Sequence, residues 1–548
     1  MSEPNSKASN QFASTGRSSK GESWVWLTAA GLTLGIVMVV FLLGLIVVRG
    51  VSSFWPRQIQ VLEVVRDDQT QIMAGYIAKR SERRDQESRL IDQVQIFRGN
   101  AEEYADPYVY LNERDIKSRE VPAGWMMLER TDDGPGILKS VALVTPNGRI
   151  DAGDEGFEDA LKKMVELNHE VREESRRIKR KLIGANSREL RDIDIAEKVG
   201  DMDAEEAAKR RAELMEEGGR LNAKVALEEE RMAGYQYIGA TAEGKEMILS
   251  GDTILNAFQP NDTGLLGRLF EMLRRMWKFL IEDPRRSNAE GGVYPAIFGT
   301  VVMTLAMTFF VTPFGVIAAI YLREYAKQGT MVRVVRICVN NLAGVPSIVF
   351  GVFGLAFFVY FVGAEIDQMF FADKLETQNE PTFGAPGILW ASLTLALLTL
   401  PVLIVATEEA LSAVPRGVRE AALACGASKW QTIQRIVIPA SLPGIMTGII
   451  LAMARGAGEV APLMLVGAVK MAHSLPIDDV APYVHPERQF MHLGFHIYDL
   501  GFKSSNADAA EPMVYATALL LILLVMVLNL AAIIIRNRLK KKFAVSHF

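Results

Sequence analysis

Long apolar runs separated by charged segments dominate the pattern of hydrophobic and polar positions in this chain. Residues 24–48 contain no charged side chain, and neither do residues 513–535. Each run is longer than the roughly 20 residues that an α-helix needs to cross a bilayer. Four further apolar runs lie at 293–322, 337–364, 387–407 and 442–469. The pattern predicts six transmembrane helices, because soluble helices rarely lack charge over so many residues.

Charges in the connecting segments predict how these helices are oriented. Residues 536–542 read RNRLKKK, and clustered positive charge favours the cytoplasmic side. The C-terminal tail, 536–548, is therefore expected to be cytoplasmic. With six spans, the N-terminal tail, 1–23, falls on the same side. No signal-peptide cleavage pattern follows residues 24–48, so this first helix is expected to remain as an anchor.

Residues 49–292 are predicted to form a large α+β extracytoplasmic insertion between helices 1 and 2. Short alternating apolar runs at about 55–152 predict strands. Residues 157–232 are rich in Glu, Lys, Arg, Ala and Leu, which predicts a helical hairpin or short coiled coil, interrupted around 184–203. A strand-like sequence pattern returns after residue 232. This order indicates that the helices are inserted into one β domain. The charged helices are typical of a solvated surface, and they also suit the docking of an extracytoplasmic partner.

An amphipathic segment at 265–282 precedes the second predicted span. One helical face carries apolar residues and the other carries four basic residues. The apolar residues are Leu266, Leu269, Phe270, Leu273, Trp277 and Leu280. This pattern predicts a helix lying in the membrane interface, and an ordinary amphipathic helix packed on the insertion is the alternative.

A polar segment at 415–439 lies between two apolar runs, on the predicted cytoplasmic side. Pro415 suits the start of a helix that runs to Ala424, and Gly426 suits a left-handed residue that ends it. Ser428 and Gln431 have the spacing of a capping box that begins a second helix. We expect Pro439 to end that second helix at the entry of the next span.

The remaining composition narrows the classes of function. The chain has 548 residues, a net charge of -5 and two cysteines, Cys338 and Cys425, which provide no disulfide framework. The sequence contains no G-x-x-x-x-G-K-[ST] loop for binding nucleotide phosphates, and no nucleic-acid partner is expected. This composition is typical of a membrane protein without its own ATPase site.

Several stretches together resemble the A-type permease of the high-affinity phosphate ABC importer family. The spacing from Glu420-Ala421-Ala422 through Gly426 to Ile436 and Ile438-Pro439 matches the signature loop of importer permeases, with Ile438 where Leu is usual. The other stretches are PFGVIAAIYLREYA at 313–326, LAGVPSIVFGVFG at 342–354, TEEALSAVPRGVREAA at 407–422 and GIMTGIILAMARGAGEVAPLM at 444–464. The resemblance covers the first span and about 293–548, and leaves most of the insertion uncovered.

The resemblance implies an all-α membrane permease core of the type I ABC importer fold, with the transmembrane domain at 293–535. It implies import of inorganic phosphate by alternating access in a bacterial inner membrane. ATP and magnesium would be used by a separate dimer of ATP-binding subunits, with no cofactor or catalysis in this chain. A second permease of the C type and a periplasmic phosphate-binding protein would complete the complex. Cytoplasmic residues 408–440 would transmit ATP hydrolysis through Glu420, Ala421, Ala422, Gly426, Ile436 and Pro439.

Arg455 and Glu459 are the charged residues inside the apolar run at 442–469. Charges inside a bilayer usually face a partner or a polar path, and an Arg guanidinium suits a phosphate oxyanion. An internal Arg–Glu pair that fixes helix packing is the alternative. The resemblance favours a place in the substrate pathway. It also reveals a departure, since Val405 stands where family members often carry an Arg.

Four histidines lie between the last two predicted spans: His473, His485, His492 and His496. The spacing of His492 and His496 is compatible with metal binding on a helix, but MHLGFHIYDL also fits an amphipathic segment that skims the membrane. We predict no metal site.

Two other functions remain open from the sequence. One is a permease for another oxyanion, such as sulfate or molybdate. The other is a membrane-anchored phosphate-signalling scaffold with the insertion as its sensing domain.

Overall fold

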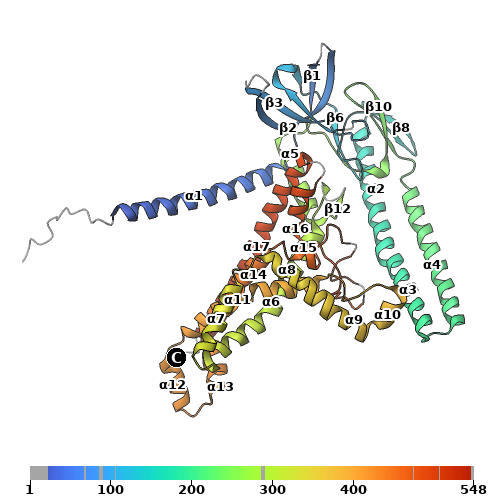
Figure 1. Cartoon of the computed structure of the whole chain (residues 1–548). Coiled ribbons are helices and arrows are strands. Elements are labelled where there is room, and N and C mark those ends of the chain that lie inside the picture. The colour runs from blue at the N-terminus through green and yellow to red at the C-terminus, as the bar shows by residue number, and fades with distance from the viewer. Residues whose placement is uncertain are drawn as a thin grey trace, which may run out of the picture.

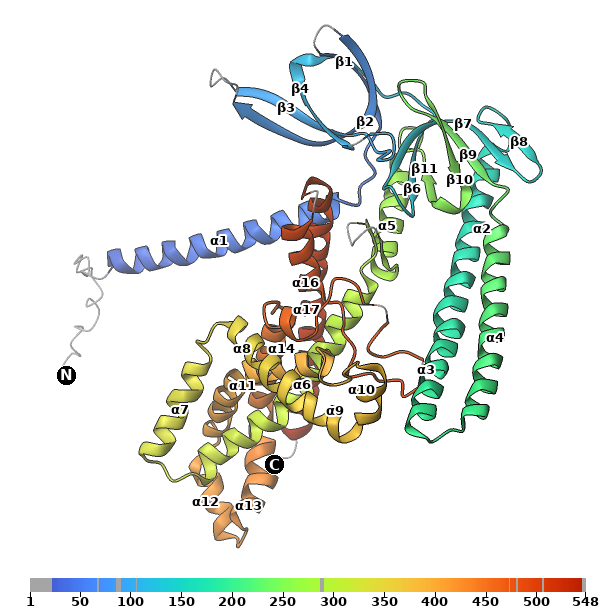
Figure 2. The same cartoon turned by 45° about the vertical axis from the view of Figure 1, so that its right-hand side comes forward.

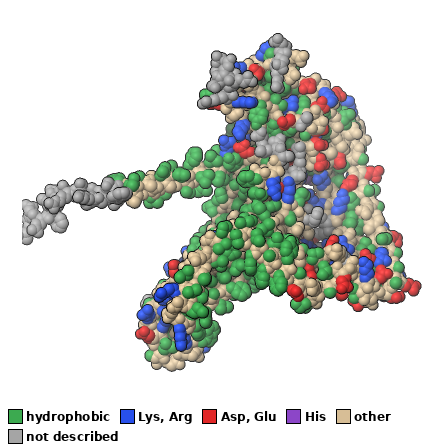
Figure 3. Space-filling model, in the orientation of Figure 1, with side chains coloured by type: hydrophobic (Ala, Val, Ile, Leu, Met, Phe, Trp, Pro, Cys, Tyr) green, Lys and Arg blue, Asp and Glu red, His purple; other side chains and the backbone are tan. Residues whose placement is uncertain are grey.

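The computed structural model describes residues 22–66, 69–84, 90–104, 106–285, 290–472, 474–479, 481–504 and 507–544. Within these residues, six helical segments are long and apolar enough to cross a membrane. They are Trp26–Ser52, Tyr294–Tyr325, Ser347–Phe370, Ile388–Ser412, Lys429–Ala457 and Ala510–Lys541. Hydrophobic side chains cover the bundle and the first helix, whereas charged side chains gather on the insertion and at the opposite end of the bundle (Figure 3).

Three helices form the centre of the bundle: α6 (Tyr294–Ile320), α11 (Ile388–Ser412) and α14 (Ile438–Ala457). Met307 of α6 and Leu395 and Leu403 of α11 are fully buried in their shared core. Gly444 and Gly448 of α14 face Ala410 and Ala406 of α11, where an added Cβ would lie 2.5 and 2.7 Å from the alanine Cβ atoms. Small residues four apart therefore let the two backbones approach closely, as in many membrane helix pairs.

Two predicted spans have different boundaries in the structure. Residues 337–342 belong to a separate helix, α7 (Thr330–Leu342), and the third span begins only with α8 (Ser347–Phe353), because Pro346 prevents a continuous helix. That span continues through a π-helical stretch to α9 (Ala364–Phe370), and α10 (Ala372–Gln378) follows. The fifth span ends at Ala457 rather than near residue 469; the short α15 (Leu463–Val466) and α16 (Leu493–Tyr498) follow it.

The β part of the insertion consists of two large antiparallel sheets and a short two-stranded ribbon. The first has the strand order β4-β3-β2-β1-β5, and the second has the order β10-β9-β7-β6-β11, with β8 paired to β7. Strands of the first sheet are β1 (Gln60–Arg66), β2 (Gln69–Arg84), β3 (Leu90–Phe97), β4 (Tyr108–Asn112) and β5 (Ile116–Glu120). Those of the second are β6 (Trp125–Arg130), β7 (Gly136–Thr145), β8 (Gly148–Asp151), β9 (Gln236–Ala240), β10 (Glu246–Ser250) and β11 (Ile254–Phe258). A short ribbon of β12 (Pro284–Arg285) and β13 (Glu290–Gly291) lies before α6.

A long helical pair is inserted between β8 and β9. Its first arm is α2 (Phe157–Arg177), a π-helical turn at Ile178–Ile183 and α3 (Gly184–Val199); its second arm is α4 (Ala204–Glu230). The predicted interruption at 184–203 is wrong for residues 184–199, which are helical, and the chain turns at Gly200, where φ is +87°. At the tip, Lys198 Nζ donates to the carbonyl of Thr377 in α10, 3.1 Å away. The two arms descend side by side from the second sheet toward α9 and α10 (Figures 1 and 2).

The first and last spans meet next to the insertion. Helix α1 (Glu22–Ser52) extends away from the bundle, and none of the residues in its most apolar window is buried (Figure 1). Near its C-terminal end, Gly50 packs on Tyr515 and Leu519 of α17 (Ala507–Ala544). Helix α5 (Leu265–Ile281) precedes the β12–β13 ribbon and the second span.

Candidate functional site

The polar segment between the fourth and fifth spans forms a sharply turned helical pair. Helix α12 spans Arg416–Ala424, and Gly426 lies just after its C-terminal cap. The φ of Gly426 is +85°, which is accessible to glycine at little cost. The N–H of Gly426 donates to the carbonyl of Leu423, and the N–H of Ala427 donates to that of Ala422, which is the bonding of a Schellman motif. The predicted helix end is confirmed.

The second helix of the pair begins with the predicted capping box. Ser428 Oγ accepts from the N–H of Gln431, and Gln431 Oε1 accepts from the N–H of Ser428, at 3.2 and 2.8 Å. Each helix start leaves N–H groups without intrahelical partners, and the capping box satisfies two of them. Helix α13 (Lys429–Thr432) therefore starts at a defined residue.

The expected helix end at Pro439 is wrong. Helix α13 continues through a π-helical turn at Ile433–Val437 directly into α14, and Val437 and Ile438 both have helical dihedral angles. Pro439 lacks the N–H that an α-helical bond to the preceding turn would need, and the wider π turn accommodates that loss. One helical rod of 29 residues, Lys429–Ala457, thus joins the polar segment to the fifth span.

The helical pair presents an exposed surface at the end of the bundle. None of the residues of α12 is buried. Of the residues assigned to coupling, Glu420, Ala421 and Gly426 are exposed, whereas Ala422, Ile436 and Pro439 are half-buried. Three large apolar side chains, Val418, Leu423 and Trp430, are also exposed on the pair. Exposed apolar groups with polar neighbours are typical of protein-binding surfaces.

An ion pair that was not predicted holds the α12–α13 pair against the second span. Arg419 Nη2 donates to Glu324 Oε1 at 3.1 Å, and its guanidinium also donates to the carbonyls of Leu411 and Val414. Beside it, Arg336 Nε donates to Glu408 Oε2 at 3.2 Å. The sequence contains only a weak signal for the Arg419–Glu324 ion pair. Glu324 lies next to Arg323 in YLREYA at the end of a span, and nothing in that stretch indicates Arg419 as its partner.

The structure brings Arg455 and Glu459 together at the other end of the rod. Arg455 lies in the last turn of α14, and its Nε is 3.8 Å from Glu459 Oε1. Glu459 is not inside a helical span as predicted, because α14 ends two residues earlier, at Ala457. The distance exceeds that of a good hydrogen bond, and the Arg455 side chain is 40% exposed. Arg455 is therefore available to a further partner.

Gly456 positions this turn within the bundle. An added Cβ would lie 2.2 Å from the sulfur of Met307 in α6. The α14 backbone therefore packs tightly on α6 next to Arg455. Val405, where an Arg was expected from the resemblance, lies exposed on α11.

The described histidines between the last two spans make contacts that are typical of residues with a structural role. His492 Nδ1 accepts from the N–H of Gly494 and caps α16, and burial lowers the pKa of this histidine to about 3. His496 is also buried. His485 lies between Asp478 and Glu487, and His473 lies outside the described residues. In the described part of the chain, no cluster of three or more His, Cys, Asp or Glu side chains is arranged to hold a metal ion.

The sequence is similar to one known protein family and to individual members of it. The family described as "Binding-protein-dependent transport system inner membrane component" matches residues 311–545. The chain is 37% identical over 261 residues to phosphate transport system permease protein PstA 1 of Mycobacterium tuberculosis (strain CDC 1551 / Oshkosh), which covers 47% of this chain and 75% of the relative. It is 34% identical over 252 residues to the PstA protein of Yersinia pestis, covering 46% and 75%.

Among solved structures, an inward-facing MetNI methionine ABC transporter is 20% identical and covers 44% of this chain and 94% of that chain, with a TM-score of 0.34.

Proposed function

This chain belongs to the family of phosphate ABC transporter permeases, and we propose that it forms the pathway for inorganic phosphate in an ATP-driven importer of the type I fold. The chain is a transporter subunit and not an enzyme. ABC importers of this family act together with an ATPase and a binding protein. We propose a dimer of ATP-binding subunits, a second permease of the C type and an extracytoplasmic phosphate-binding protein as the specific partners.

The observation that carries the proposal is the continuous helix Lys429–Ala457. At 1.5 Å per residue, this rod is about 40 Å long. One end belongs to the exposed α12–α13 pair, and the other end carries Arg455. A partner that binds the pair and moves it therefore also moves Arg455, because a packed helix transmits displacement as a rigid element.

The exposed face of the pair supports docking of the ATPase at this end of the bundle. Val418, Leu423 and Trp430 offer apolar area, and Glu420 lies among them in sequence. Gly426 sets the angle between the two helices. ATP and magnesium would remain on the partner, and this chain would contribute only the docking surface and the rod.

The chemistry of Arg455 supports an anionic substrate. A guanidinium donates parallel hydrogen bonds to two oxygens of a phosphate. Its 3.8 Å contact with Glu459 is loose enough to be exchanged for a substrate oxygen. Glu459 would then release and recapture Arg455 as the substrate passes. Sulfate and molybdate carry similar oxygens, so Arg455 alone does not select among oxyanions.

The same arrangement supports a topology with the C-terminal tail in the cytoplasm, and with six spans the N-terminal tail is proposed to lie on the same side. The C-terminal end of α17 lies toward the end of the bundle that carries α12 and α13 (Figures 1 and 2). The last turns of α17 are rich in basic residues, and the positive-inside bias favours a cytoplasmic position for such a cluster. The insertion lies at the opposite end and would be extracytoplasmic. Helix α5 would lie in the membrane interface there, since Leu266, Phe270 and Trp277 are all strongly exposed.

Uptake of labelled phosphate in a deletion strain tests this function. Complementation with the wild-type gene should restore uptake, and excess sulfate or molybdate should not compete. Unchanged phosphate uptake after deletion, in a strain without another phosphate importer, would disprove the proposed cargo. Competition by sulfate would instead assign the pathway to another oxyanion. Retained uptake with a lost transcriptional response to phosphate would favour the signalling scaffold.

A further inference from the structure

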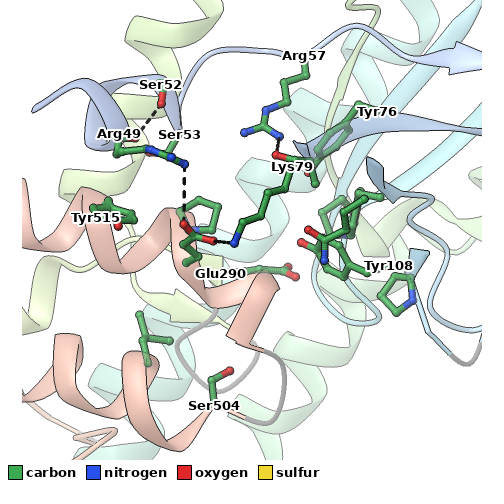
Figure 4. A pocket seen from close by; sticks show the side chains of 18 of the residues that line it. Arg49, Ser52, Ser53, Arg57, Tyr76, Lys79, Tyr108, Glu290, Ser504 and Tyr515 are labelled. Carbon is green, nitrogen blue, oxygen red and sulfur yellow. Dashed lines mark hydrogen bonds and ion pairs between the residues drawn. The ribbon is translucent and has the colours of Figure 1, made fainter. Parts of the chain in front are cut away.

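A cavity of about 590 Å³ lies where the insertion meets the first and last spans. Several parts of the chain form its walls (Figure 4). The end of α1 contributes Arg49 and Ser53, and the first sheet contributes Tyr76 and Lys79. A further wall comes from residues 499–504, including Asp499, and from the first turns of α17, including Glu511 and Tyr515. The cavity is thus formed only when the insertion and the spans are assembled.

Basic side chains outnumber acidic ones in the described lining of this cavity. The six basic residues are Arg49, Arg57, Lys79, Arg275, Lys470 and Lys503. The three acidic residues are Glu290, Asp499 and Glu511. The remaining lining includes Trp55, Phe97 and Met127, and such apolar walls strengthen the field of the charges beside them. The cavity therefore has a net positive field.

Glu511 occupies the position between two of these cations. Its Oε1 lies 3.9 Å from Arg49 Nη1, and its Oε2 lies 3.5 Å from Lys79 Nζ. Arg49 belongs to α1 and Lys79 to β2, so one carboxylate bridges the first span and the insertion. Both contacts are longer than charge-assisted hydrogen bonds, which are about 2.7–2.9 Å. An anion with more oxygens would fit between the same cations with shorter contacts.

Other contacts hold parts of the cavity wall in place before any anion binds. Arg57 Nη1 donates to the carbonyls of Ile77 and Ala78, at 2.9 and 2.7 Å, and its guanidinium lies over the ring of Tyr76. Arg275 donates to Glu271, a carboxylate that Arg274 also uses. Sharing one carboxylate between two guanidinium groups leaves positive charge unneutralised at this wall.

We propose that this cavity binds a phosphate-type oxyanion that links the insertion to the first and last spans. The oxygens contact Arg49 and Lys79 in place of the Glu511 carboxylate. Free inorganic phosphate and the phosphate of a lipid headgroup share this chemistry. The site is separate from Arg455 and does not depend on phosphate being the transported cargo.

Binding of ³²P-labelled inorganic phosphate to the purified, nucleotide-free complex of permease and ATPase subunits, prepared without the phosphate-binding protein, tests the proposal. All variants carry Arg455→Gln, so that binding at Arg455 does not contribute. Lys79→Gln should weaken binding by about tenfold, as expected for a lost charged contact. Glu511→Gln should tighten it, because the competing carboxylate is removed; a purely structural role of Glu511 would not produce tighter binding. Lys162→Gln, an exposed lysine of α2, is the matched control and should leave affinity unchanged.

A lipid source is distinguished by native mass spectrometry of the same variants from nanodiscs containing phosphatidylglycerol. A retained phosphatidylglycerol that is lost in Lys79→Gln and kept in Lys162→Gln supports the site with a lipid headgroup as its ligand. Phosphate binding with the pattern given above supports it with the free anion. The proposal is overturned if neither phosphate nor phosphatidylglycerol responds to Lys79→Gln and Glu511→Gln. Failure of transport through Arg455 would change none of these results.

Discussion

Arg419 and Glu324 connect the α12–α13 pair to the end of the second span, with Nη2 and Oε1 3.1 Å apart. Both side chains are largely buried, at 17% and 12% exposed. The same guanidinium donates to two carbonyls at the end of α11. One side chain therefore joins the polar pair to two spans at once.

Glu324→Gln should reduce coupled transport by about tenfold and leave assembly intact. The substitution removes the charge but keeps the shape, and truncating one partner of a largely buried charge pair typically costs a few kcal/mol. Phosphate uptake and ATP hydrolysis of the reconstituted complex measure the effect. Glu409→Gln, an exposed residue of α11, is the control. Equal transport by both variants would mean that the Arg419–Glu324 contact does not contribute to coupling.

Arg455→Gln should lower the maximal transport rate by at least about tenfold, since a charged hydrogen-bond donor to the substrate is lost. The double variant Arg455→Gln/Glu459→Gln separates this role from helix packing. If the pair only fixes packing, the neutral double variant should recover much of the transport that the single variant lost. If Arg455 contacts substrate, the double variant should remain as slow as Arg455→Gln.

The free energy of unfolding of the protein should fall as the pH decreases from about 6.5 toward 5. Burial lowers the pKa of His492 to about 3, and burial lowers that of His496 to about 4, with Asp499 opposing and Lys470 adding to the effect. An unfolded histidine titrates near 6.5, so the unfolded chain binds more protons in this window and folding is disfavoured there. Above pH 6.5 this contribution is fully present.

The slope of thermal stability against pH measures this effect. His496→Leu should flatten the slope between pH 6.5 and 5, whatever its effect on stability at pH 8. An unchanged slope would show that His496 is not held neutral by burial.

A nitroxide spin label on Leu266→Cys of α5, in a background without Cys338 and Cys425, should report contact with lipid. The side chain of Leu266 is 80% exposed, and an interfacial helix places such a residue among acyl chains. EPR power saturation measures how strongly each of two reagents enhances relaxation of the nitroxide. One reagent is oxygen, which partitions into lipid, and the other is a water-soluble nickel complex. Lys162→Cys supplies the aqueous reference. Equal accessibility to the nickel complex at both positions would favour a helix that is packed only on the insertion.

Local signals in the sequence predicted the coupling element well and its connection to the span poorly. Gly426 and the Ser428–Gln431 spacing act within a few residues, and the structure has both caps as expected. Pro439 gave a misleading signal, because a π-helical turn lets the helix continue through it. The continuous rod was therefore not predictable from capping rules.

Contacts between distant residues account for the other differences. Arg419 and Glu324 are 95 residues apart, and no periodic pattern links such positions. The two sheets of the insertion depend on strand pairings such as β7 with β9, which span the whole helical pair. The cavity at Glu511 similarly requires α1, β2 and α17 to be placed together.

Gly426→Val tests whether the α12–α13 pair couples ATP hydrolysis to transport. No atom lies within 4 Å of an added Cβ at Gly426, so the substitution acts through the backbone, where a β-branched residue at φ +85° is strained. Gly426→Asn is the matched control, because asparagine tolerates this conformation. Gly417→Ala, an exposed position of α12 without a positive φ, controls for added bulk.

The ratio of phosphate imported to ATP hydrolysed, measured in proteoliposomes containing the assembled complex, is the most direct measurement. We expect a ratio about tenfold lower for Gly426→Val than for wild type, since the strain corresponds to about 1–3 kcal/mol. Gly426→Asn and Gly417→Ala should keep ratios near that of wild type. An unchanged ratio in Gly426→Val, with normal assembly, would mean that the α12–α13 pair does not couple ATP hydrolysis to transport.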